Sequence, residues 1–172
     1  DTFNSFANKV GWLNMDIWQQ TRMYYQLYLY YHAQGHNPNF YPTLFKMLRQ
    51  DPIQKRSNDY DASLVDGEGN TVGGYKSYGK DDYLHMAKKM CDAAGEDLSE
   101  FFEVNGMFVP VTNKYVGDYS NYWVTTTQED INAAKAYMHR YPKAGNICFI
   151  DDRVKLSPVL EDSPLEGKST QE

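Results

Sequence analysis

Apolar and aromatic residues are densest in residues 12–34, where they recur at spacings of three and four. This spacing is typical of a helical face, and the aromatic residues around the rest of the segment predict a long helix buried between other elements. Asn14 or Asp16 can begin the helix, because a short side-chain acceptor satisfies free N–H groups in a first turn. Gly35 can end it in a left-handed conformation. We therefore expect the shorter elements to pack around this helix.

The remaining periodic segments are shorter. Apolar periodicity and capping signals predict further helices at residues 40–50, 80–94, 97–104 and 126–140. Short apolar runs predict strands at residues 107–111, 146–151 and 153–156. A glycine-rich stretch, residues 54–79, predicts a small hairpin or loop around a turn at residues 66–70, and residues 112–122 are predicted to be a loop. The fold class is therefore mainly α with minor β (α+β), a helical bundle with a few short strands towards the C-terminus.

One domain accounts for most of the chain. We expect residues 1–156 to form a single, mostly helical domain, and residues 157–172, which carry prolines and acids with few apolar residues, to be a disordered tail. The chain begins at Asp1 without a visible signal peptide, as a processed or excised segment would. Whether it is a fragment or a whole mature protein stays open.

The charge balance of the chain argues against one class of ligand. Lys plus Arg number 17 and Asp plus Glu 23, giving a net charge of −6, and this argues against nucleic-acid binding, which needs clustered basic side chains. No run approaches the roughly 18–20 apolar residues of a membrane span. Cys91 and Cys148 could pair or remain free, and we favour free, buried thiols.

Two groups of possible metal ligands are present. His32 and His36 have the spacing of the histidines in a zinc-binding H-E-x-x-H helix, but Ala33 replaces the general base and Gly35 is a helix terminator, so no zinc site is expected in this chain. The acidic loop at residues 59–70 offers five oxygen donors. Calcium takes six to eight, and the EF-hand order is not matched. A solvated turn is favoured over a calcium site, which stays open.

Tyrosine is unusually frequent, at 15 of 172 residues. Sugars bind to aromatic rings when nearby polar side chains bond their hydroxyls. A platform of this kind is available in one aromatic stretch, made of Tyr115, Tyr119, Tyr122 and Trp123. One hypothesis is therefore a glycan- or glycopeptide-binding module, and another is a scaffold whose aromatic surface docks a second domain.

Two stretches of the chain carry a family resemblance. They are WQQTRMYYQLYLYYHAQGHNPNFYPTLFKMLRQDP, residues 18–52, and AAGEDLSEFFEVNGMFVPV, residues 93–111. Together they resemble the C-terminal helical region of the M60-like (enhancin-like) gluzincin metallopeptidases, which follows the zinc motif. The defining H-E-x-x-H and its downstream glutamate ligand are absent here, so no catalytic or metal-ligating residue is carried over to this chain.

The resemblance implies a non-catalytic helical subdomain of a secreted or cell-surface zinc metallopeptidase that acts on mucin-like glycoproteins. Zinc is implied for the parent enzyme only, and this chain is expected to be inactive alone. Its implied partners are an upstream catalytic domain of the same protein and a glycoprotein or peptide substrate. In gluzincins the C-terminal helical subdomain forms one wall of the substrate cleft, so Trp18, Arg22 and Tyr25 are expected to face substrate.

Overall fold

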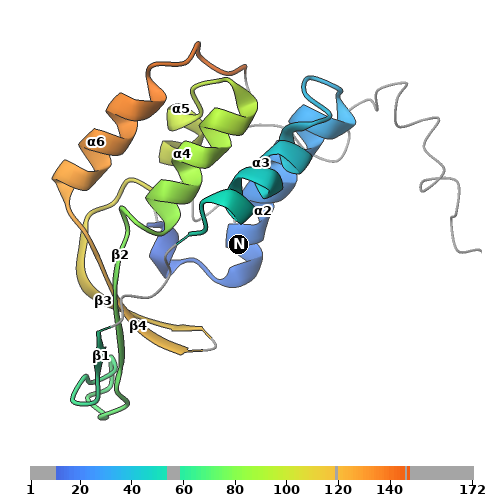
Figure 1. Cartoon of the computed structure of the whole chain (residues 1–172). Coiled ribbons are helices and arrows are strands. Elements are labelled where there is room, and N and C mark those ends of the chain that lie inside the picture. The colour runs from blue at the N-terminus through green and yellow to red at the C-terminus, as the bar shows by residue number, and fades with distance from the viewer. Residues whose placement is uncertain (1–10, 54–58, 119, 146, 148–172) are drawn as a thin grey trace, which may run out of the picture.

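The computed structural model describes residues 11–53, 59–118, 120–145 and 147 (Figure 1). Helices gather at one end of the molecule, and a sheet extends from beneath them. The helical elements are η1 (Trp12–Asn14, 3₁₀), α2 (Ile17–Leu27), η2 (Tyr28–Ala33, π), α3 (Phe40–Gln50), α4 (Tyr83–Ala94), α5 (Ser99–Val104) and α6 (Gln128–Met138). The strands are β1 (Tyr60–Asp61), β2 (Gly74–Tyr78), β3 (Val111–Asp118) and β4 (Ser120–Thr126). The α+β class is confirmed, but the prediction of a few short strands towards the C-terminus is wrong, because β1 and β2 lie in the middle of the chain and pair into the same four-stranded sheet.

The long N-terminal helix is divided into three parts. After η1 the chain is extended at Met15 and Asp16, and Asp16 then caps α2. The Gln19 N–H donates to Asp16 Oδ1 at 2.9 Å, and the Asp16 N–H donates to Gln19 Oε1 at 3.1 Å. This reciprocal pair satisfies two free donors of the first turn. The helix widens into η2 and is followed by Gly35 at φ 76°, as predicted.

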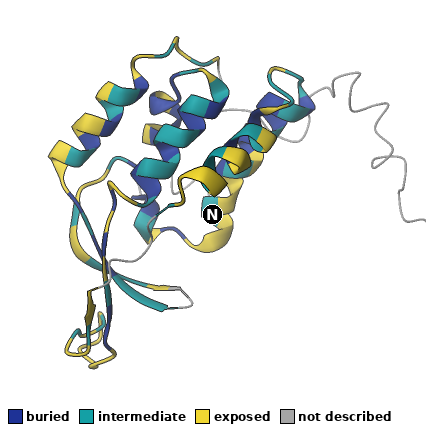
Figure 2. Ribbon diagram, in the orientation of Figure 1, coloured by how far each residue is buried: buried dark blue, intermediate teal, exposed yellow. Residues whose placement is uncertain are grey.

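Burial of this helix is one-sided, so the expected burial on all sides is not confirmed. Met23 and Leu27 are fully buried and Tyr31 is 1% exposed, whereas Ile17 is 60% and Trp18 81% exposed (Figure 2). The neighbouring helix α3 packs against η2 and α4. Apolar residues on a small domain commonly remain at the surface, because polar residues are too few to cover it.

The other helices follow local signals closely. Helix α3 has the predicted bounds, and α4 ends at Gly95, which has φ 70°. The N-cap of helix α6 is Thr127, one residue after the predicted cap Thr126, because Thr127 and Asp130 form the capping box. These helices and η1, α2 and η2 enclose the main core. Its largest fully buried side chains are Tyr31, Phe40, Phe102, Met23, Leu27, Leu44, Leu84, Met90, Leu98, Met107, Ile131 and Met138.

Asp92 ties α4 to the C-terminal end of α6. Its carboxylate accepts hydrogen bonds from the hydroxyls of Tyr137 (2.9 Å) and Tyr141 (2.7 Å) and from Arg140 Nη2 (2.9 Å). The Arg140 guanidinium also lies 3.5 Å from the centroid of the Tyr137 ring. A charged acceptor with three donors is a stronger link than a solvent-exposed ion pair.

The sheet has the order β1-β2-β4-β3, with β2 parallel to β4 and the other pairs antiparallel. The prediction of a loop over residues 112–122 is wrong, because these residues belong to the hairpin of β3 and β4. The predicted strand at residues 107–111 is also wrong, since β3 begins only at Val111. Pro110, which has no N–H for a strand ladder, precedes that start. The predicted small hairpin around residues 66–70 is present as a bridge between Val65 and Thr71.

The two faces of the sheet have different surroundings. Val116, Tyr122 and Val124 pack against the helical core. Side chains alternate along a strand, so Trp123 and its antiparallel partner Tyr115 lie on the outer face. Trp123 is nevertheless only 6% exposed. The outer face of the sheet is therefore partly covered.

Several predictions fall on residues outside the described ranges. These are the strands at residues 146–151 and 153–156, the tail at residues 157–172, Tyr119 and Cys148. Cys91 is a free, buried thiol. Burial raises its pKa to about 12. None of the helices in the described ranges is long and apolar enough to cross a membrane.

Candidate functional site

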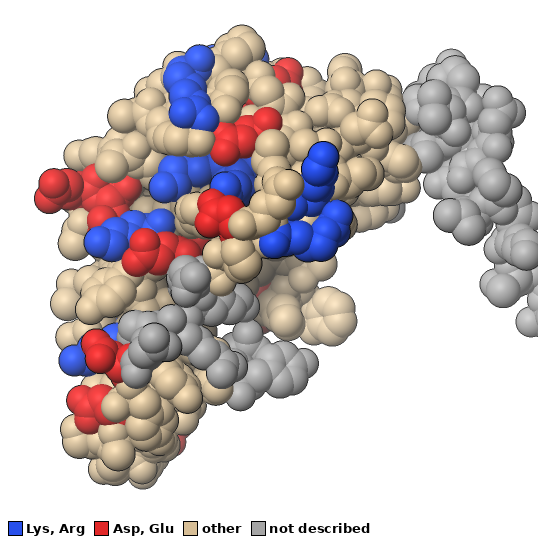
Figure 3. All heavy atoms as spheres, in the orientation of Figure 1, with Lys and Arg blue, Asp and Glu red and all other residues tan. Residues whose placement is uncertain are grey.

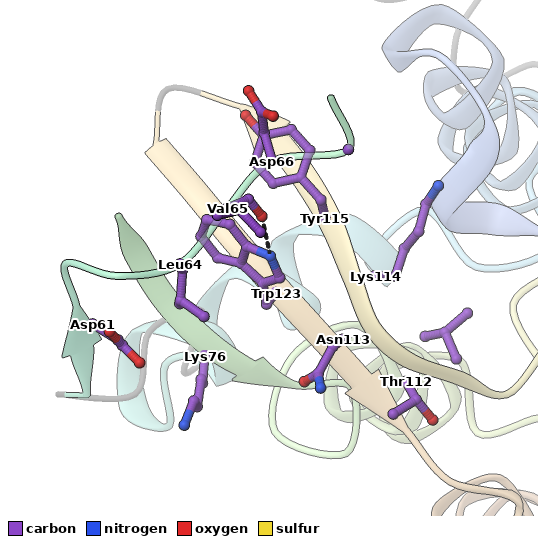
Figure 4. A pocket seen from close by; sticks show the side chains of 12 residues that line it. Asp61, Leu64, Val65, Asp66, Lys76, Thr112, Asn113, Lys114, Tyr115 and Trp123 are labelled. Carbon is purple, nitrogen blue, oxygen red and sulfur yellow. Dashed lines mark hydrogen bonds between the residues drawn. The ribbon is translucent and has the colours of Figure 1, made fainter. Parts of the chain in front are cut away.

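A hollow of about 770 Å³ lies on the outer face of the sheet (Figure 4). Strands β2, β3 and β4 contribute to it, and the loop between β1 and β2 forms its other side. The lining residues are Asp61, Leu64, Val65, Asp66, Gly67, Lys76, Val111, Thr112, Asn113, Lys114, Tyr115 and Trp123. We refer to this hollow as the outer groove. Its volume lies within the range of about 300–1,000 Å³ that is usual for small-molecule sites.

An aromatic pair forms the base of the outer groove. The ring centroids of Tyr115 and Trp123 are 5.2 Å apart at an angle of 55°. The Trp123 indole N–H donates to the Val65 carbonyl oxygen at 3.0 Å, and the Tyr115 hydroxyl donates to Asn121 Oδ1 at 2.8 Å. A Cβ placed on Gly74 would collide with the Trp123 ring, so glycine allows this ring to lie against β2. Both rings are therefore held in fixed orientations.

The loop beside the rings is held by its own carboxylates. Asp66 Oδ1 accepts the N–H groups of Glu68 and Asn70, each at 2.9 Å, and Asp66 Oδ2 accepts Asn70 Nδ2 at 3.1 Å. Asp61 Oδ1 accepts the N–H and the hydroxyl of Ser63 at 2.9 and 2.6 Å. Hydrogen bonds from Asn70 and Ser63 accordingly lower the pKa of Asp66 and Asp61, respectively. The acidic loop is therefore a turn whose carboxylates accept hydrogen bonds from residues of the same loop.

Charged and neutral polar side chains surround the rings of Tyr115 and Trp123. Lys76, Thr112 and Asn113 are exposed along the rim. Asn113 has φ 48°, and its N–H donates to Thr125 Oγ1 at 3.1 Å where the register between β3 and β4 shifts. In Figure 4 Lys114 points away from Trp123. The groove can thus offer hydrogen-bond donors and acceptors around an aromatic base.

The predicted aromatic platform is divided by strand alternation. Tyr115 and Trp123 lie together in the outer groove, whereas Tyr122 packs on the helix side of the sheet. The Tyr122 ring is 6.3 Å from the Tyr75 ring. Tyr119 lies outside the described residues. Asp61 and Asp66, two of the five oxygen donors of the acidic loop, line the groove, whereas Lys76 and Asn113 were not foreseen, because their proximity depends on pairing between distant strands.

The second group of predicted site residues forms an exposed face of α2. Trp18 is 81% and Tyr25 48% exposed, and Arg22 between them is also exposed. Their spacings of four and three place them on one side of the helix. The Tyr25 ring stacks on the Tyr28 ring, with centroids 6.0 Å apart and an angle of 14°. The structure therefore brings the three residues together at the surface of α2.

The histidine pair does not form a metal site. The His36 ring stacks on Tyr30 at 4.2 Å, and the His32 ring lies 5.2 Å from that of Tyr28. Within the described ranges no group of three or more His, Cys, Asp or Glu side chains could hold a metal ion. His32 and His36, which have no third ligand among the described residues, do not fit a catalytic zinc ion.

The chain is similar to metallopeptidases of known structure. One is a metallopeptidase in complex with Tn antigen, with TM-score 0.66 and 30% sequence identity over 87% of this chain and 26% of that one. Another is a metallopeptidase from Bacteroides thetaiotaomicron, with TM-score 0.66 and 29% identity over 89% of this chain and 24% of that one. No protein-family profile and no curated protein matches the chain. This similarity supports a relation to the M60-like metallopeptidases. The chain spans about a quarter of the length of these two metallopeptidases.

Proposed function

We propose that this chain is a non-catalytic helical subdomain of an M60-like zinc metallopeptidase, and that it forms part of the cleft for a mucin-like glycoprotein substrate. The observation that carries the proposal is the similarity over 87% of the chain, at 30% identity, to a quarter of a metallopeptidase in complex with Tn antigen. The two stretches that resemble the C-terminal helical region of the family, residues 18–52 and 93–111, both lie within the described ranges.

The exposed face of α2 is the part of the chain that we assign to the cleft wall. Trp18 supplies a large apolar ring, and Arg22 supplies a planar guanidinium that can bond a carboxylate or a carbonyl oxygen of substrate. Tyr25 offers a second ring with a polar tip. Exposed Trp, Tyr and Arg side chains are the types that most often dominate binding energy at interfaces. This face would bind and orient substrate, without a role in proton or group transfer.

Catalysis is assigned to polypeptide outside this chain. Zinc would activate water for peptide hydrolysis in the parent enzyme, and it would be held by an upstream catalytic domain of the same protein. We place that parent enzyme outside the cell or at its surface. Basic and acidic side chains are interspersed on the face shown in Figure 3, and ion pairs such as Lys135–Glu103 and Lys143–Glu100 occur in the structure. This mixed charge pattern favours a protein or glycoprotein partner over a nucleic acid.

The proposal is tested by comparing the 172-residue chain with a longer polypeptide that includes its upstream coding sequence. Zinc content and cleavage of a mucin-type glycoprotein are measured for both. We expect zinc and cleavage in the longer polypeptide only. One zinc ion per chain together with hydrolysis by the 172-residue chain would contradict the non-catalytic assignment, and an upstream sequence without H-E-x-x-H would contradict the parent enzyme.

A second candidate is a glycan- or glycopeptide-binding module. It is favoured by the outer groove, in which Tyr115 and Trp123 lie beneath a polar rim. The neighbour in complex with Tn antigen gives a suitable first probe. Titration of the 172-residue chain with a Tn-bearing peptide and with the same peptide lacking the sugar separates the two candidates. Binding that depends on the sugar supports the module, and equal binding of both peptides argues against it.

A further inference from the structure

We propose that the outer groove is a binding subsite for a short, neutral saccharide, and that it discriminates against acidic sugars. The inference rests on the second candidate function and deepens it by naming the site and the class of sugar. It is independent of the α2 face, because no residue of α2 lines the groove.

The base of the groove is suited to the apolar face of a sugar ring. C–H groups of a pyranose carry partial positive charge and are attracted to the negative face of an aromatic ring. Tyr115 is half-buried and Val65 is 46% exposed, so both side chains are accessible to a sugar. Trp123 is 6% exposed and acts as rigid backing, since its N–H is already bonded to the Val65 carbonyl. Rings that are fixed before binding lose little conformational entropy.

The rim is suited to sugar hydroxyls, which both donate and accept hydrogen bonds. Lys76 offers donors, Asp61 offers its carboxylate, and Thr112 and Asn113 offer groups of both kinds. Lys76 lies close enough to Asp61 to help lower the pKa of that carboxyl. A rim with paired signs favours a neutral polyhydroxylated ligand over a simple anion or cation.

The charges around the aromatic pair set the preference for neutral sugars. Asp66 lies toward the Tyr115 end of the groove, while Asp61 and Lys76 lie together at the other end (Figure 4). Hydrogen bonds from Asn70 lower the pKa of Asp66, so its carboxylate is charged at neutral pH. Lys114 lies at the other side of Tyr115 and points away from Trp123 (Figure 4). A sugar carboxylate at this end would meet a like charge, which weakens binding by about three- to tenfold at moderate salt.

Gly67 allows the groove to be closed without disturbing its base. It lines the groove, a Cβ at this position would have no neighbouring atom within 4 Å, and its φ lies outside the left-handed region. Gly67→Trp therefore adds a bulky side chain at the edge of the groove without a clash at its Cβ. Glu68→Trp is the matched control, because Glu68 is exposed, adjacent in sequence and absent from the lining.

The experiment titrates the 172-residue chain with a panel of neutral saccharides, including galactose, N-acetylgalactosamine and lactose, and with sialyllactose. The indole N–H of Trp123 is followed by NMR, and Trp123→Phe assigns its signal. We expect at least one neutral saccharide to shift this signal. If lactose is the ligand, sialyllactose should bind about three- to tenfold more weakly than lactose. Gly67→Trp should weaken saccharide binding at least about tenfold, whereas Glu68→Trp should not.

Three results would overturn the inference. They are an unmoved Trp123 signal with every neutral saccharide, equal binding by Gly67→Trp, or tighter binding of the acidic sugar. Failure of the parent-peptidase proposal is distinguishable, because it is read from zinc content and glycoprotein cleavage. Failure of the second candidate is distinguishable from failure of this site, because sugar-dependent binding that survives Gly67→Trp supports a binding module but locates the sugar elsewhere on the chain.

Discussion

Replacing Gly74 by alanine tests the geometry of the outer groove directly. Gly74 lies in β2 opposite β4, where a Cβ would meet the Asn121 carbonyl oxygen and the Trp123 ring, and would lie 2.9 Å from Asn121 Cβ. One obstacle is backbone and another is a ring held by a hydrogen bond to Val65, so neither can move freely. Gly74→Ala must therefore displace the ring, the strand or both.

The expected cost follows from this overpacking. Extra carbon atoms in a well-packed site cost about 1–3 kcal/mol. The obstacles are backbone and a fixed ring, so the cost should lie in the upper part of this range, and alanine recovers about 0.5–1 kcal/mol relative to glycine in an extended strand. We therefore expect a net loss of about 1–2 kcal/mol. For a chain of this size such a loss lowers Tm by about 2–8 °C.

The assay is urea and thermal unfolding of Gly74→Ala beside Gly67→Ala, whose Cβ has open space around it. Gly67→Ala should change the free energy of unfolding by less than about 0.5 kcal/mol. The Trp123 indole NMR signal should move in Gly74→Ala and stay in place in the control. Equal stability of the two variants, with an unchanged Trp123 signal, would refute the packing of Trp123 on β2.

Three other predictions concern the rest of the fold. Asp92→Ala leaves two tyrosine hydroxyls and an arginine without their shared acceptor. It should therefore lower the free energy of unfolding, measured in urea titrations, by about 2 kcal/mol. A loss below about 0.5 kcal/mol would show that α4 and α6 are held by other contacts. Trp18→Ala should change that free energy by less than about 0.5 kcal/mol because Trp18 is 81% exposed, and a larger loss would mean that the ring is buried. Burial raises the pKa of Cys91 from 9.0 and of Tyr83 from 10.0, each to about 12. The unfolded chain therefore releases these protons first, so stability should be unchanged below about pH 9 and fall towards pH 12; an equal urea midpoint at about pH 8 and pH 11 would contradict this.

Helices with strong local signals were predictable from the sequence. Helix α3 (Phe40–Gln50) was predicted with its observed bounds, because an apolar face lies between Pro38 and Pro52. The α6 cap was displaced by one residue, since Thr126 and Thr127 are both followed three residues later by an acid. The half-exposed N-terminus of α2 was not predictable, because aromatic residues around a helix do not reveal how many neighbours it has.

The sheet was less predictable for a physical reason. Strands β3 and β4 contain tyrosine, asparagine, aspartate and glycine, a composition typical of a loop. The parallel pairing of Tyr75 with Tyr122 joins residues far apart in the chain, and no local pattern encodes it. Side-chain direction in a strand depends on register, so Tyr122 and Trp123 could be identified as candidates without knowing that they face opposite sides. The groove and its rim follow only from that register.

Cleavage kinetics of the parent polypeptide test the central claim most directly. The longer polypeptide that contains the upstream sequence is compared as wild type, as the Trp18→Ala/Arg22→Ala/Tyr25→Ala variant, and as a control with the exposed Lys46 of α3 replaced by alanine. If the α2 face is part of the substrate cleft, the triple variant lowers kcat/KM for a mucin-type glycoprotein by about tenfold or more, while its zinc content and Tm equal those of the wild type. The Lys46→Ala control should have the kcat/KM of the wild type. An unchanged kcat/KM in the triple variant would contradict the assignment of this chain to the substrate cleft.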